Sequence, residues 1–93
     1  MFDHSDVRSN FPILSRQVNG KPLVYLDNGA SAQKPQVVID AISTAYSHEY
    51  ANVHRGLHYL SNLATDKYEN VRSIIARFLG VADERQIIMN SGT

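Results

Sequence analysis

The sequence predicts an α/β chain, and three observations lead to this class. Two long segments repeat apolar residues with the 3.6-residue period of an α-helix. An Asn-Gly pair at positions 19–20 separates two short segments, which is typical of a β-hairpin. A short apolar run, IIM at 87–89, indicates a strand buried on both faces, as in a parallel sheet. The expected order is helix, hairpin, helix, helix, strand.

The first two expected elements are short. Residues 5–14, SDVRSNFPIL, predict one short helix that Ser5 caps and that Pro12 keeps from growing longer. Residues 17–26 predict the hairpin, with its turn at Asn19-Gly20 because both residues tolerate a positive φ.

The next two elements are the long helices. Pro35 suits the first turn of a helix, where its missing N–H costs nothing, and this helix is expected to run to about Tyr50. The second is expected over 59–79, where Gly80 is a natural stop. Its expected core stripe consists of Leu60, Leu63, Ala64, Tyr68, Val71, Ile75 and Phe78.

The last element is the strand at 86–90, and it raises the question of completeness. A strand buried on both faces needs neighbours, and the sequence offers no second strand of this kind. Its partners are therefore expected in further sequence or in another chain. We expect the 93 residues to be the front of something larger, whose core is incomplete alone.

Composition excludes several classes of function. Nine basic residues balance nine acidic ones, so nothing points to nucleic acid as a partner. No apolar run has the length of a membrane span, and the polar N-terminus does not resemble a signal peptide. Cysteine is absent, which excludes disulfides, thiolate metal ligands and a cysteine nucleophile within these residues. A cytoplasmic location is expected by default.

Two stretches have the composition of ligand-binding loops. In NSGT, at 90–93, a strand ends in a Gly/Ser/Thr turn that can point backbone N–H groups at an anion, although a plain surface turn remains the alternative. In YLDNGASAQKP, an Asx turn explains Asn28, Gly29 and Pro35. The four small residues at 29–32 instead suggest space for a ligand or a crossing backbone. Both interpretations stay open for each stretch.

A third stretch, NVHRGLHYLS, contains two histidines. His54 and His58 are four residues apart, but Gly56 lies between them and no third ligand is evident, so no metal site is predicted. Arg55 beside His54 can bind an anion or line an interface. The alternative is a solvated loop with a helix cap. The three lysines, Lys21, Lys34 and Lys67, have no context that suggests a lowered pKa.

Taken in order, these stretches resemble one family. DVRSNFPIL, VNGKPLVYLDNGASAQKPQVVIDAI, YANVHRGLHYLSNLAT, YENVRSIIARFLG and IIMNSGT together resemble the N-terminal part of a SufS-type cysteine desulfurase. These enzymes are class V members of the fold-type I family of pyridoxal 5′-phosphate (PLP) enzymes. The resemblance covers essentially the whole chain. It implies that residues 1–93 are an N-terminal fragment of the fold-type I PLP-dependent transferase fold.

The resemblance also implies an activity. Such enzymes are homodimers that convert L-cysteine to L-alanine and leave a persulfide on an enzyme cysteine, for a sulfur-acceptor protein and iron–sulfur cluster assembly. L-selenocysteine is often a second substrate. The family's Schiff-base lysine and persulfide cysteine match no position here, so no catalytic residue is assigned and the 93 residues alone are expected to be inactive. A non-enzymatic fragment that pairs with a full-length subunit, or a fragment of a selenocysteine lyase or other class V lyase, are the alternatives.

Some roles carry over by position. Gly92 and Thr93 match the start of the loop that binds the cofactor phosphate. Gly29 and Ala30 match the turn beside the substrate carboxylate. His54 and Arg55 match a segment near the active-site mouth and dimer interface.

Overall fold

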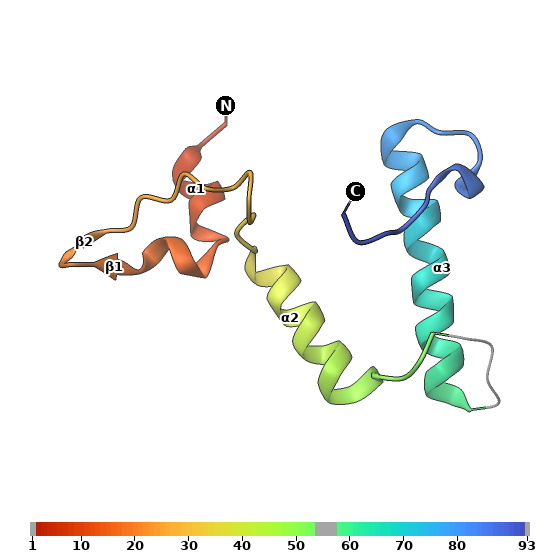
Figure 1. Ribbon diagram of the computed structural model, residues 1–93. Helices are drawn as coiled ribbons and strands as arrows, with labels where there is room; N and C mark the ends of the chain where they lie inside the picture. The colour runs from red at the N-terminus through yellow and green to blue at the C-terminus, as the bar shows by residue number, and fades with distance from the viewer. Residues whose placement is uncertain (1, 54–57, 93) are drawn as a thin grey trace. The chain divides into compact units, whose positions relative to one another are not determined.

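The computed structural model describes residues 2–53 and 58–92 of the chain. The chain divides into two compact units, residues 1–46 and 47–93, which are described separately (Figure 1).

The first unit begins with helix α1 (His4–Ser9) and a 3₁₀-helix, η1 (Pro12–Ser15). The expectation of one helix over 5–14 is therefore wrong. Phe11 has extended backbone angles, because a proline restricts the residue before it and cannot donate a helical hydrogen bond. The cap is also different: the Asp3 carboxylate accepts the Ser5 N–H at 2.8 Å.

The hairpin follows, with strands β1 (Gln17–Val18) and β2 (Lys21–Pro22) paired antiparallel. Its predicted turn is confirmed, since Asn19 and Gly20 both have positive φ, 53° and 75°. The pairing is shorter than the expected 17–26, and Leu26 is 90% exposed. An isolated two-stranded ribbon is only marginally stable, so additional paired residues would add little stability.

Helix α2 (Gln36–Thr44) begins near the predicted start, but Pro35 has extended backbone angles and is the N-cap rather than a residue of the first turn. The Gln36 N–H donates to the Asn10 carbonyl at 2.7 Å, which ties the start of α2 to the residue that ends α1. Residues Ala45–Glu49 continue as a π-helical turn, η2, so the predicted helix is nearly correct in length but changes its winding at the end.

The second unit is built on α3 (Tyr59–Leu79), whose bounds are those predicted. His58 Nδ1 accepts the Ser61 N–H at 3.2 Å and so caps the helix start. Gly80 ends the helix with φ 73°, and the next N–H, of Val81, donates back to the Ala76 carbonyl at 2.8 Å. Lys67 forms an ion pair with Glu49 at 2.7 Å.

The predicted core stripe of α3 is only partly covered. Among the described residues, the one buried hydrophobic side chain is Ala76, at 5% exposure, whereas Phe78 is 87% exposed. The element packed on α3 is a short 3₁₀-helix, η3 (Glu84–Gln86). A helix of 21 residues needs more cover than one such turn supplies.

The predicted strand at 86–90 is wrong for the described part of the chain. Gln86 ends η3, and residues 87–90 are irregular, with Ile88 78% exposed. A strand is defined by a hydrogen-bonded neighbour, and no described segment pairs with this one.

Candidate functional site

The small-residue stretch forms a closed turn in the first unit. The N–H groups of Ala30 and Ser31 both donate to the Asp27 carbonyl at 3.1 Å. The Tyr25 hydroxyl donates to the Ser31 carbonyl at 2.6 Å and lies 3.3 Å from the Asp27 carbonyl. The side chain of Tyr25 thus joins the two ends of the turn.

Gly29, inside this turn, has open space around its Cα and, among the described residues, a free backbone N–H. A Cβ added there meets no atom within 4 Å, and its φ lies outside the left-handed region. No described residue accepts a hydrogen bond from its N–H. The Ala30 N–H, by contrast, is used within the turn. Of the two predicted substrate-binding residues, Gly29 therefore keeps an N–H that can still serve a ligand.

A cavity of about 370 Å³ lies beside the turn. Its lining residues are Arg8, Phe11, Leu14, Tyr25, Asn28, Ala32 and Gln33. Within the part of the chain that the structure describes, the Arg8 guanidinium has no hydrogen bond or ion pair. A guanidinium binds a carboxylate through two parallel hydrogen bonds, so this cavity has the chemistry to accept a small anion.

Sequence reasoning missed Arg8. It lines the cavity together with residues 17 to 25 positions further along the chain, and helical periodicity carries no information on such neighbours.

The second candidate region is the end of the chain. Gly92 has a φ of 76°, and a Cβ there would meet no atom within 4 Å. An exposed glycine turn of this kind lets a ligand approach the backbone, which fits one edge of a phosphate loop for PLP. Thr93 lies outside the described residues.

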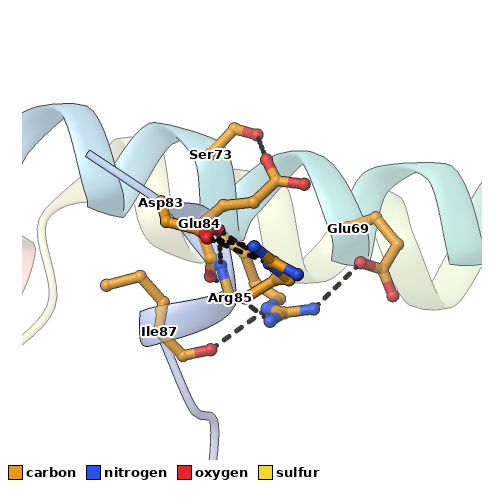
Figure 2. Close-up of polar contacts among 7 residues, drawn as sticks. Glu69, Ser73, Asp83, Glu84, Arg85 and Ile87 are labelled. Atoms are coloured by element: carbon orange, nitrogen blue, oxygen red, sulfur yellow. Dashed lines mark hydrogen bonds and ion pairs between the residues drawn. The ribbon is translucent and has the colours of Figure 1, made fainter. Parts of the chain in front are cut away.

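Polar contacts hold the residues that precede Gly92 (Figure 2). The Arg72 guanidinium donates to the carbonyls of Ile87 and Glu84, at 3.1 and 3.3 Å, and to the Glu69 carboxylate at 3.2 Å. Ser73 hydrogen-bonds to the Glu84 carboxylate. These contacts join the segment after α3 to the helix itself.

A local ion pair lies in the same segment. The Arg85 guanidinium donates to both carboxylate oxygens of Asp83, which also accepts the Arg85 N–H at 2.9 Å. The Arg85 side chain, and then its N–H, lower the pKa of Asp83, and the same carboxylate raises the pKa of Arg85.

The two predicted interface residues, His54 and Arg55, lie outside the described residues. His58 caps the start of α3. This agrees with the alternative interpretation of the stretch, a solvated loop with a helix cap. No group of three metal-ligating side chains occurs among residues 2–53 and 58–92. No helix in these ranges is long and apolar enough to cross a membrane.

Comparison with known proteins decides the family. The sequence profile of the family described as Aminotransferase class-V matches residues 24–93. The chain belongs to this family. The resemblance drawn from the motifs is therefore confirmed.

The individual relatives that match this chain are described as cysteine desulfurases. The chain is 52% identical over 93 residues to a probable cysteine desulfurase of Mycobacterium leprae (strain TN), covering 100% of this chain and 15% of that protein. It is 52% identical over 92 residues to a cysteine desulfurase of Salmonella newport (strain SL254), covering 99% of this chain and 23% of that protein.

A solved structure agrees with these relatives. The apo structure of a cysteine desulfurase from Thermococcus onnurineus NA1 matches with a TM-score of 0.70 and 40% identity, over 87% of this chain and 19% of that one. The chain thus spans less than a quarter of the length of these proteins.

Proposed function

We propose that this chain is the N-terminal segment of a PLP-dependent cysteine desulfurase that converts L-cysteine to L-alanine and an enzyme persulfide for iron–sulfur cluster assembly. The observation that carries the proposal is 52% identity along the whole chain to proteins described as cysteine desulfurases. The complete protein is then a cytoplasmic homodimer that passes sulfur to an acceptor protein.

Each predicted site residue has a defined task in this proposal. When bound, PLP supplies the electron-withdrawing ring that the chemistry needs. Gly92 and Thr93 hold its phosphate through backbone N–H groups and the threonine hydroxyl. The Gly29 N–H binds the substrate carboxylate, because the Ala30 N–H is already bonded within its turn. His54 and Arg55 lie at the mouth of the active site or at the dimer interface.

The balance of the reaction shows what the 93 residues lack. The C–S bond of L-cysteine breaks, the sulfur joins a cysteine thiol as a persulfide, and the carbon takes up a proton to give alanine. The sequence has no cysteine, so the acceptor thiol must lie elsewhere in the complete protein.

The proposal is tested by comparing the complete gene product with the 93-residue chain. Both are incubated with PLP and L-cysteine, and alanine and sulfide are measured. We expect alanine from the complete protein and none above the blank from the 93 residues. Alanine formation by the 93 residues, or a complete product that makes no alanine, would contradict the proposal.

One alternative function has an observation in its favour. Large apolar side chains are exposed along α2 and α3, for example Val37, Ile42 and Phe78. Such surfaces suit a fragment that pairs with a full-length desulfurase subunit without catalysis of its own. Mixing the labelled 93-residue chain with the complete protein and measuring co-elution distinguishes pairing from no interaction.

A further inference from the structure

The segment of residues 81–92, called the terminal segment here, leaves α3 at Gly80 and returns beside that helix. Its one regular element is η3 (Glu84–Gln86), whose turn is closed by two hydrogen bonds. The Gln86 N–H donates to the Asp83 carbonyl and the Ile87 N–H to the Glu84 carbonyl, both at 3.0 Å. In the described part of the chain, no strand pairing holds the residues beyond it.

Arg72 links this segment to the helix. Its Nε donates to the Ile87 carbonyl at 3.1 Å and its Nη2 to the Glu84 carbonyl at 3.3 Å. Its Nη1 donates to Glu69 one turn earlier on α3, at 3.2 Å. The Arg72 side chain is 24% exposed, so water competes for these bonds less than at an open surface.

The geometry of these bonds requires arginine. A guanidinium presents donors in one rigid plane, and here three different nitrogens reach three acceptors. Two of the acceptors are backbone carbonyls, which have no charge to attract a cation from a distance. A lysine ammonium, as a compact point charge, cannot reproduce this planar set.

We propose that Arg72 is a positioning residue: it fixes the backbone at Glu84 and Ile87 against α3 and so sets where the chain presents Gly92. This inference rests on the proposed function, in which Gly92 begins the loop for the PLP phosphate. In this role Arg72 acts through the backbone that it holds and not through a bond of its own to cofactor or substrate. Its effect on the cofactor passes through the four residues between Ile87 and Gly92, which form an irregular stretch.

The chain offers a matched control in Arg85. Its guanidinium bonds only to the Asp83 carboxylate, two residues away, among the described residues (Figure 2). It lies in the same segment as the carbonyls that Arg72 holds but makes no bond to α3. Removing its charge changes the same region without breaking the link to the helix.

The experiment uses the complete protein that carries this segment, with the variants Arg72→Gln, Arg72→Lys, Glu69→Gln and Arg85→Gln. Hydrogen exchange of the Gln86 and Ile87 amides is measured without cofactor. The dissociation constant of PLP is then measured by absorbance titration. We expect Arg72→Gln to exchange about tenfold faster and to bind PLP about tenfold more weakly. Arg72→Lys should behave similarly, Glu69→Gln should change less, and Arg85→Gln should stay within about twofold of wild type.

The two readouts separate the possible failures. Equal exchange in Arg72→Gln and Arg85→Gln would overturn the role of Arg72 in holding the segment. Faster exchange with an unchanged PLP constant would overturn its role toward the cofactor. A wild-type protein that binds no PLP would refute the proposed function, while exchange would still decide whether Arg72 holds the segment. If Arg72→Gln fails to fold, Arg72→Lys decides the same question, because a lysine cannot donate to both carbonyls from one rigid plane.

Discussion

Gly29 and Gly80 differ in how well the backbone would tolerate an added methyl group. Gly80 has a left-handed φ of 73° at the end of α3, whereas Gly29 has no positive φ and open space around it. We expect Gly80→Ala to cost about 1 kcal/mol locally and to speed exchange of the Val81 amide about fivefold. Gly29→Ala should leave that amide unchanged. Hydrogen exchange of the complete protein checks this, and equal effects at the two positions would contradict it.

The same Gly29→Ala change tests substrate binding. Because the chain leaves room for the methyl, the turn should persist and the Ala30 and Ser31 amides should exchange as in wild type. If the substrate carboxylate approaches the Gly29 N–H, the methyl crowds it, and KM for L-cysteine should rise about tenfold. Steady-state kinetics of the complete protein measures this. Gly20→Asn, at a hairpin turn that asparagine tolerates, is the control, and an unchanged KM in Gly29→Ala would refute the assignment.

Asp83 and Arg85 give a prediction for pH. Arg85 holds the pKa of the Asp83 carboxyl below its ordinary value, so the folded state favours the ionised form. The resulting stabilisation of η3 is present at neutral pH and above the unfolded pKa of about 4, and is lost as the pH falls through the lower folded pKa. We expect NMR titration to show a low Asp83 pKa that Arg85→Gln raises. A pKa that this substitution leaves unchanged would contradict the assigned cause.

At the scale of elements, the sequence predicts best what is locally encoded. Helix α3 has the expected bounds because its apolar period lies within the element and its stop signal, Gly80, follows it directly. The turn at Asn19-Gly20 is likewise a property of two residues. Pro12 broke the first expected helix because its effect on the preceding residue outweighed the apolar spacing around it.

Elements and contacts that depend on distant partners were not predictable in the same way. The IIM run is apolar enough for a strand, but a strand forms only with a neighbour. Space at Gly29 was one of two interpretations of the small residues. Arg72 was missed because it bonds backbone carbonyls 12 and 15 positions away, and Arg8 because it lines a cavity with residues 17 or more positions away. The binding and interface roles assigned to the site residues all stay predictions: Gly29, Ala30, His54, Arg55, Gly92 and Thr93.

Ser61 supplies a test of how α3 is anchored. It is fully buried, and its hydroxyl donates to the Asn52 carbonyl at 3.1 Å, which holds the chain before the helix against its first turn. We expect Ser61→Ala to cost about 1 kcal/mol and to speed exchange of the Asn62 amide about fivefold.

The control for this test is a substitution one turn further along α3. Thr65→Ser keeps a hydroxyl that can still donate to the Ser61 carbonyl, so it should leave the exchange of the Asn62 amide close to wild type. Faster exchange in both variants would mean that the Asn52 bond is not the cause.

At the scale of the whole molecule, the surface area is large for the mass. The chain of 10.4 kDa exposes 8126 Å². Two separate compact units of half that mass would expose about 6500 Å² together, so the excess does not depend on how the two units sit. Much of it is apolar, since large side chains of both units are exposed, among them Val24, Val37 and Phe78.

This excess predicts how the 93 residues behave alone. Burial of apolar area must offset the conformational entropy that every ordered residue loses. In these 93 residues little apolar area is buried, while the entropic cost of ordering each residue stays the same. We expect a broad thermal transition by circular dichroism, strong binding of a hydrophobic dye, and self-association at micromolar concentration. The complete protein, measured in parallel, should melt sharply and bind little dye. A sharp melt of a monodisperse 93-residue chain would mean that the helices bury their apolar faces within the chain. It would favour an independent interaction module over an enzyme segment.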